Sequence, residues 1–141
     1  MRGGRRVRTE SELSMYAKQI YLNLVVIRSV DLNTSERFYR ELGLFFEREK
    51  HGNGPEHLAT GAEAGGVVFE IYPLGTKHQP TTSTRLGFGV DDVDSYMGRI
   101  AELGGSIISE PKDSEWGRRA VIKDPDGHTI ELLSQPSRKT N

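Results

Sequence analysis

The sequence predicts an α+β fold built from two βαβββ modules. The first observation is an internal repeat, in which three markers recur with a constant offset of 61 residues (92−31, 104−43 and 131−70). The markers are Asp31-Leu32 with Asp92-Val93, Leu42-Gly43 with Leu103-Gly104, and Glu70 with Glu131. The second observation is that both halves present strand-type and helix-type segments in the same order. Such a repeat is a supersecondary unit that cannot bury its apolar face alone, so we expect the two copies to complete one another.

The first half is predicted to contain a strand, a helix and three further strands. Their predicted ranges are 20–28, 34–42, 44–50, 56–60 and 67–72. Asp31 or Asn33 caps the helix, since short polar side chains accept hydrogen bonds from its free N–H groups. Gly43 ends the helix because glycine adopts the left-handed conformation without strain. Asn53-Gly54 predicts a tight turn between the second and third strands.

The second half repeats this order. Its strands are predicted at 85–90, 107–108, 118–123 and 129–133, and its helix ends at residue 103. Asp92 or Asp94 caps this helix and Gly104 ends it. The segment Asp124–Gly127 (DPDG) has the composition of a tight turn before the last strand.

The domain organisation follows from composition. Residues 1–14 contain four arginines and few apolar residues, which indicates a flexible N-terminal tail over 1–18, with Met15 as an alternative start of the natural chain. After this tail we expect one domain (19–136) and then a C-terminal tail (137–141). The domain consists of module one (19–73), a linker (74–84) and module two (85–134). The linker is rich in Pro, Thr and Gly.

The overall composition excludes several classes of function. A formal net charge of −1 provides no field that would favour nucleic acid or an anionic membrane. The absence of cysteine excludes disulfides and thiolate metal sites and agrees with a cytoplasmic location. The apolar runs are too short to span a bilayer.

Two motifs carry a resemblance to a known family. They are DLNTSERFYRELG at Asp31–Gly43 and DPDGHTIEL at Asp124–Leu132. With the doubled βαβββ order, the chain resembles the vicinal oxygen chelate superfamily, which includes glyoxalase I, extradiol dioxygenases, fosfomycin-resistance enzymes and bleomycin-binding proteins. The resemblance implies a curved mixed sheet that forms a cup around a small molecule, with the helices on the outer face.

The resemblance also implies positions for a metal. Enzymes of the superfamily hold a divalent ion with residues of the first and fourth strand of each module, commonly two histidines and two glutamates. The fourth-strand positions match Glu70 and Glu131, but the first-strand positions match Leu24 and Arg85. The chain therefore keeps the two carboxylates and lacks the two histidines.

Strand alternation places both glutamates in the cup, because the apolar residues on either side of each must face the helices. Two carboxylates in one cavity repel one another, so a cation should accompany them. Three readings stay open. The first is a metal-free network between Arg85 and the glutamates, and the second is a weakened or re-ligated site on Glu70 and Glu131 for one divalent metal (Ni, Mn, Zn, Fe or Mg). In the third, the glutamates simply face solvent.

The histidines offer a further candidate. In a two-residue hairpin His51 lies opposite Glu56 and His57 opposite Lys50, so the two histidines fall on opposite faces and at most one enters the cup. His57 is the candidate for a substrate-binding or proton-transfer role, since it lies inside its strand. His128, in the last turn, is expected in solvent.

Arg28 and Trp116 complete the predicted substrate-binding residues, with Arg85 and His57. Arg28 shares the strand face of Leu24 and either binds an anionic group or stands in water. Trp116 forms either a stacking platform for a ligand or part of a module interface.

The predicted function is that of a glyoxalase-like protein, a metal-assisted lyase or isomerase for a substrate with vicinal oxygens, with Glu131 and Glu70 as catalytic residues. The alternative is a non-catalytic protein of the same fold that binds or sequesters a small, antibiotic-type molecule without a metal. The missing histidines favour the second reading, and the retained glutamates favour the first. A homodimer is expected, and neither nucleic acid nor a membrane is an expected partner.

Overall fold

The computed structural model describes residues 7–14, 20–61 and 66–135. The elements in chain order are α1 (Glu10–Ser14), β1 (Leu24–Ser29), α2 (Leu32–Glu41), β2 (Phe46–Glu49), β3 (His57–Thr60), β4 (Val68–Pro73), β5 (Arg85–Gly89), the 3₁₀-helix η1 (Val93–Arg99), β6 (Ser106–Ser114), β7 (Gly117–Lys123) and β8 (Thr129–Ser134).

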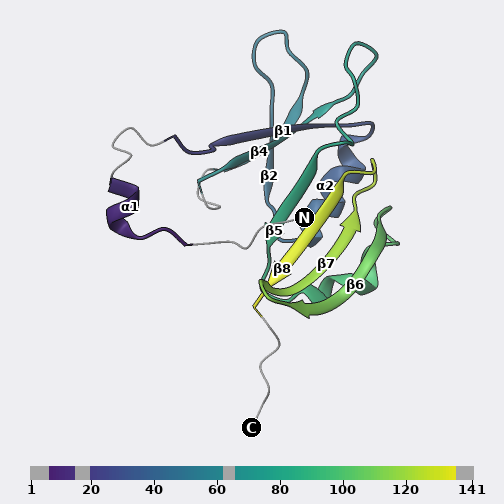
Figure 1. Cartoon of the computed structure of the whole chain (residues 1–141). Helices are drawn as coiled ribbons and strands as arrows, with labels where there is room; N and C mark the ends of the chain where they lie inside the picture. The colour runs from purple at the N-terminus through teal and green to yellow at the C-terminus, as the bar shows by residue number, and fades with distance from the viewer. Residues whose placement is uncertain (1–6, 15–19, 62–65, 136–141) are drawn as a thin grey trace.

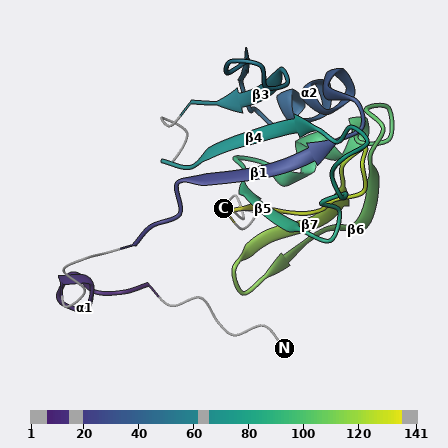
Figure 2. The same cartoon turned by 90° about the horizontal axis from the view of Figure 1, so that it is seen from above.

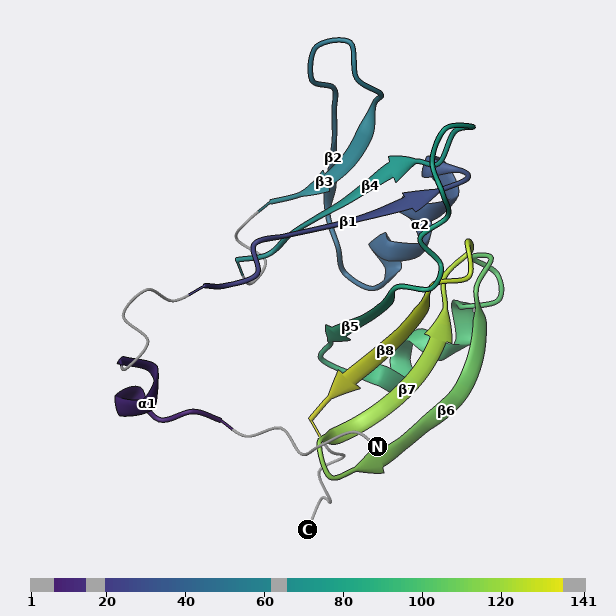
Figure 3. The ribbon, with the colours of Figure 1, turned by 45° about the horizontal axis from the view of Figure 1, so that its top comes forward.

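The strands form two four-stranded mixed sheets of the same topology (Figures 1 and 3). Sheet one has the order β1-β4-β3-β2 and sheet two the order β5-β8-β7-β6. In each sheet the first strand is parallel to the fourth, and the remaining pairs are antiparallel. The predicted α+β fold with two βαβββ modules is confirmed, and its eight strands are divided between two sheets.

The first helix forms as the sequence predicts. The Asp31 carboxylate accepts a hydrogen bond from the backbone N–H of Thr34 at 3.1 Å and so caps α2. Gly43 follows the helix with φ +99°, a conformation that residues with a side chain rarely adopt.

The second helix differs from the prediction of a regular, capped α-helix. It is the 3₁₀-helix η1, and the Asp92 side chain does not cap it. Its sequence VDSYMGR combines β-branched, short polar and glycine residues, which have low helix propensity. Such a segment forms the tighter 3₁₀ turn more readily than a long α-helix. Gly104 still ends the region with φ +92°.

A single apolar core joins the two modules. It contains Phe38 and Tyr39 of α2, Ile100 after η1, and the inward residues of both sheets, such as Ile71 and Ile130. All five of these side chains are almost completely buried. Figure 3 shows α2 behind sheet one and the η1 region behind sheet two. The helices therefore cover one face of each sheet, and the opposite face, named the cup face below, has no helix of the described residues over it.

A buried polar cluster fastens the modules together through the DPDG turn. Asp124 Oδ2 accepts hydrogen bonds from the Tyr39 hydroxyl at 2.6 Å and from His128 Nδ1 at 2.8 Å. Burial alone would raise the pKa of Asp124, but the hydrogen bonds from His128 and Tyr39 outweigh it and hold this pKa below its usual value. Burial, followed by the charge of Asp124, raises the pKa of Tyr39 well above its usual value.

His128 is fully buried, and the prediction that it lies in solvent is wrong. Its Nδ1–H faces the ionised Asp124, so its Nε2 accepts the hydroxyl hydrogen of Thr81, 2.6 Å away. Thr81 in turn accepts the backbone N–H of Arg28 at 2.9 Å. Through these bonds, the segment predicted as the linker connects the last turn of module two to β1 of module one.

The segments outside the sheets contain little regular structure. Residues 74–84 form turns without a strand or helix. The predicted N-terminal tail includes α1, which lies apart from both sheets (Figure 2), while its residues 1–6 and 15–18 lie outside the described residues, as does the predicted tail 137–141. None of the described helices is long and apolar enough to cross a membrane.

Candidate functional site

Glu70 lies on the cup face of sheet one, as its strand alternation predicts. Its neighbours Phe69 and Ile71 are buried in the core at 6% and 0% exposure, whereas the Glu70 side chain is 15% exposed. Because residues paired in register share a face, Val26 and Ala59 flank Glu70 on the adjacent strands.

His57 is the main polar neighbour of Glu70. Its Nε2 lies 3.7 Å from Glu70 Oε2 and 3.7 Å from Glu49 Oε1. Its ring is 1% exposed and stacks on Tyr72, with centroids 4.1 Å apart and planes at 7°. Nδ1 lies 3.2 Å from the carbonyl oxygen of Pro55. The structure therefore brings together two of the predicted site residues, His57 and Glu70.

The hairpin that carries His57 has a different register from the predicted one. His57 lies opposite Glu49 instead of Lys50, and the ladder stops there. Pro55 lacks an N–H and cannot extend the ladder as far as the Asn-Gly turn. The loop is consequently wider, and His51 comes near His57, with ring centroids 5.2 Å apart.

Glu131 lies on the cup face of sheet two and is held by an arginine. Its side chain is 6% exposed, and its Oε1 accepts a hydrogen bond from Arg119 Nε at 3.1 Å. Arg118, the adjacent residue, instead pairs with Asp94 of η1 at 2.7 Å. Adjacent residues of a strand point to opposite faces, which explains why these two arginines have different partners.

Of the three open readings, the one that pairs the glutamates with Arg85 does not hold among the described residues. Arg85 is exposed at the start of the edge strand β5 and makes no ion pair with a described residue. Arg119 lies on the central strand β7, diagonal to Glu131, where water competes less for its guanidinium. The sequence contained no signal that separated these two diagonal arginines.

A hollow of about 290 Å³ opens beside Glu131. Its lining residues are Gly87, Phe88, Gly89, Glu131 and Leu133. A Cβ atom added to Gly87 or Gly89 would meet nothing within 4 Å, so the missing side chains create this space. Neither glycine belongs to a motif that would mark a site in the sequence, although both alternate with the residues that face the core.

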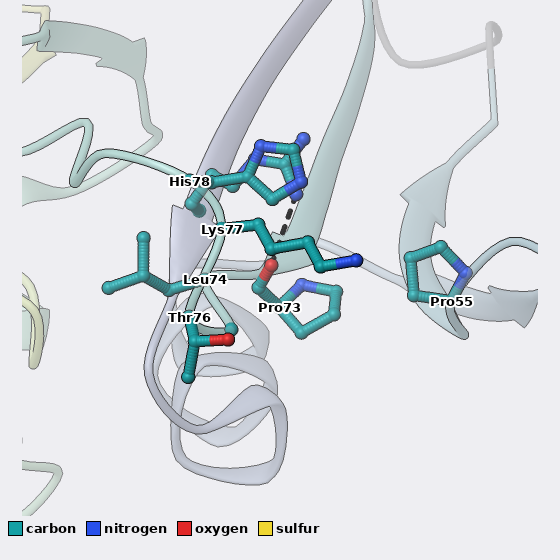
Figure 4. Close-up of a pocket in the computed structure, with 8 residues that line it drawn as sticks. Pro55, Pro73, Leu74, Thr76, Lys77 and His78 are labelled. Atoms are coloured by element: carbon teal, nitrogen blue, oxygen red, sulfur yellow. Dashed lines mark hydrogen bonds between the residues drawn. The ribbon is translucent and has the colours of Figure 1, made fainter.

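A second hollow, of about 220 Å³, lies at the end of β1 and β4. Its lining residues are Arg28, Pro55, Pro73, Leu74, Gly75, Thr76, Lys77 and His78. Figure 4 shows the Lys77 side chain reaching across it toward Pro55. The Arg28 guanidinium donates to the carbonyl oxygen of Pro73 at 3.1 Å and lies 5.3 Å from the centre of the Tyr72 ring. This cationic rim suits an anionic group of a ligand.

Neither of the two hollows contains all of the other predicted site residues. Trp116 is half-buried in the turn between β6 and β7 and lines neither hollow. Glu70 and Glu131 lie on different sheets, and neither hollow contains both. Their convergence on one centre remains a prediction.

The donor set at the superfamily's metal position does not fit a divalent metal. Leu24 offers no ligand atom, Arg85 is a cation, and Glu131 is already paired with Arg119. Divalent ions need several oxygen or nitrogen donors with free lone pairs. We therefore derive no chemistry from a metal at this position.

Two other groups of side chains in the described residues have their possible ligand atoms close together. One is Asp124, Asp126 and His128, and the other is Glu49, His51 and His57. In the first group, Asp124 Oδ1 already accepts three backbone N–H groups, and both oxygens of Asp126 accept hydrogen bonds from module one. That group acts as a structural cluster, and the second group is the one whose lone pairs are available.

Comparison with known proteins agrees with this architecture. A sequence model of the Glyoxalase/Bleomycin resistance protein/Dioxygenase superfamily matches residues 21–132, and the chain belongs to this superfamily. It is 31% identical over 135 residues to a "Probable lactoylglutathione lyase" of Synechocystis sp., covering 85% of this chain and 99% of that protein.

Two similar proteins from Streptomyces have names of a different kind. Over 60 residues, 43% of this chain and 22% of the relative, the chain is 50% identical to the anthracycline biosynthesis protein DauV. The solved structure of TnmS3, described as an antibiotic binding protein, is similar with a TM-score of 0.65 and 27% identity, covering 85% of this chain and 98% of that one.

Proposed function

We propose that this protein binds a small organic molecule on its cup face, in the hollow beside Glu131. The observation that carries this proposal is a hollow with two side-chain-free positions, Gly87 and Gly89, on its wall. The same hollow is lined by the nearly buried carboxylate of Glu131, which Arg119 already neutralises. A neutralised carboxylate beside open, apolar space accepts a hydrogen bond from a hydroxyl or amine without strongly attracting a free cation.

The proposed ligand class is an aromatic, hydroxylated molecule of the antibiotic type. The names of DauV and TnmS3 concern antibiotic biosynthesis and binding, and a polycyclic molecule offers both the flat apolar surface and the hydroxyl donors that such a hollow can use. The cationic rim at Arg28 and Lys77 would hold an acidic substituent if the ligand extends that far.

The test uses a substitution that fills the hollow without disturbing the fold. Gly87→Leu adds a side chain into open space on a strand, and Gly98→Leu adds the same side chain to an equally open position of η1, away from the cup. Binding of a panel of aromatic antibiotics, an anthracycline included, is measured by calorimetry. We expect binding by the wild type and by Gly98→Leu, and at least a tenfold loss in Gly87→Leu. Equal binding by all three proteins would refute the assigned position.

A second candidate function is that of a lyase. It is favoured by the lactoylglutathione lyase relative, which matches over almost its whole length, and by the retained pair Glu70 and Glu131. The assay is formation of lactoylglutathione from the hemithioacetal of methylglyoxal and glutathione, with nickel, manganese, zinc, iron or magnesium added in turn. Activity that disappears in Glu131→Gln would support this candidate, while a wild type inactive with every ion would remove it.

We also propose that the chain pairs with a second copy. The start of β1 and the segment before it expose apolar side chains, with Ile20, Tyr21, Leu22 and Leu24 between 47% and 97% exposed, and β1 is an edge strand of its sheet among the described residues. Such an edge is suited to pairing. Light scattering after gel filtration tests this, and a monomer at micromolar concentration would contradict it. The cytoplasmic location remains a prediction.

A further inference from the structure

We propose that Glu49, His51 and His57 form a binding site for a divalent transition metal at the β2–β3 hairpin. The site lies on one sheet and is separate from the superfamily's position on the first and fourth strands of both modules. It does not depend on the small-molecule binding proposed above.

The ligand atoms are near the spacing that a metal requires. Glu49 Oε1 lies 3.7 Å from His57 Nε2 and 3.9 Å from His51 Nε2, and the three residues each offer one ligand atom within 4.8 Å of the others. Bonds of about 2.0–2.1 Å in a tetrahedral site put ligand atoms roughly 3.4 Å apart. The side chains of His51 and Glu49 are 71% and 38% exposed, so they can close this small difference without a change in the fold.

The surroundings of His57 select the nitrogen that would bind. Because the Pro55 carbonyl can only accept, Nδ1 carries the hydrogen and donates to it at 3.2 Å. In the neutral ring, which is the form that binds metals, this leaves a lone pair on Nε2. Metal-binding histidines commonly donate their other N–H to a carbonyl, which sets both the tautomer and the ring orientation. The stacked Tyr72 ring holds the imidazole in the same plane.

The lone pair on Nε2 has no protein partner. Among the described residues, His57 Nε2 is the buried side-chain polar atom that makes no hydrogen bond. Its nearest polar neighbours, oxygens of Glu49 and Glu70 at 3.7 Å, are themselves acceptors. A nitrogen lone pair between two carboxylates is stabilised by a cation between them, and burial of such a group without one is costly.

The chemistry of the donors determines the class of ion. Two imidazoles and a carboxylate suit zinc, nickel, cobalt or copper, while magnesium and calcium prefer oxygen ligands alone. The exposed side of His51 leaves a coordination position open to water. Glu70 lies beyond the three ligands, where its charge would strengthen binding without a direct bond.

The experiment titrates the untagged full chain with zinc by calorimetry and with cobalt by visible absorption, which reports four-coordinate cobalt. We expect one equivalent to bind, with about a 100-fold weaker affinity in His57→Gln, His51→Ala and Glu49→Gln, and about a tenfold weaker affinity in Glu70→Gln. Each type of ligand has a matched control: His78→Ala, an exposed histidine outside the three ligands, and Glu47→Gln, two residues from Glu49 on the same strand.

The variants keep the result decisive even if the buried His57 is needed for folding. His51 is exposed, so His51→Ala removes a ligand from a protein that remains folded, and circular dichroism verifies this. Absence of zinc binding in the wild type would overturn the site. A loss in His78→Ala as large as in His51→Ala would overturn it as well, because it would indicate diffuse binding to surface histidines.

Discussion

Replacement of Tyr39 by phenylalanine tests whether the DPDG turn fastens module two to module one. The change removes one hydroxyl and leaves the buried ring in place. That hydroxyl donates to the Asp124 carboxylate at 2.6 Å, and the two residues are 0% and 3% exposed. A hydrogen bond to a charged group contributes about 1.5–3 kcal/mol, and a buried acceptor that loses it has no water to replace it.

The expected size of the effect lies in this range. Asp124 keeps its bonds from His128 and from three backbone N–H groups, so its charge is not left unpaired and the loss should not exceed about 3 kcal/mol. For a chain of this size, that corresponds to a fall in Tm of roughly 5–10 °C.

Chemical denaturation monitored by circular dichroism measures the change in free energy of unfolding. The matched control is Tyr96→Phe, which removes a hydroxyl bonded to Asp91 at 3.0 Å in an exposed position. We expect a loss below about 0.5 kcal/mol there, because water replaces the bond. If Tyr39→Phe is no more destabilising than Tyr96→Phe, the reasoning about the buried carboxylate is refuted.

Three further predictions concern stability. The pKa of Asp124 is depressed in the folded state, so its contribution should be constant above about pH 5 and disappear as the pH falls through the folded-state pKa, which acid titration of the free energy of unfolding measures. Gly105→Ala should cost about 1–3 kcal/mol, because its Cβ would lie 2.5 Å from a backbone carbonyl oxygen of β7, and an unchanged Tm would contradict this packing. Arg119→Met should cost about 1–3 kcal/mol by removing the guanidinium that pairs with the nearly buried Glu131 carboxylate, and restoration of stability by adding Glu131→Gln would verify the pairing.

The positions of the two glutamates could be predicted because strand geometry is local. Alternation of side chains requires Glu70 to face away from Phe69 and Ile71, whatever the rest of the chain does. The capping of α2 by Asp31 is local in the same sense, since the cap and the groups it binds lie within one turn. These features survive in the structure without correction.

The partners of those glutamates could not be predicted, because they depend on register and burial. Arg85 and Arg119 are both diagonal to Glu131, and only the central position of β7 favours Arg119. The proximity of His57 to Glu49 follows from a hairpin that Pro55 widened, and the prediction of a tight turn missed it.

The sequence alone determined the duplicated βαβββ order, the helix boundaries at Asp31 and Gly43, and the strand faces, because each depends on a few neighbouring residues and on a short period. Tertiary structure decided which cation meets Glu131, that His128 is buried against Asp124, and that Nε2 of His57 lies between two carboxylates. Each of these contacts depends on strand register and burial, and its energy depends on desolvation, which no local pattern of residues reports.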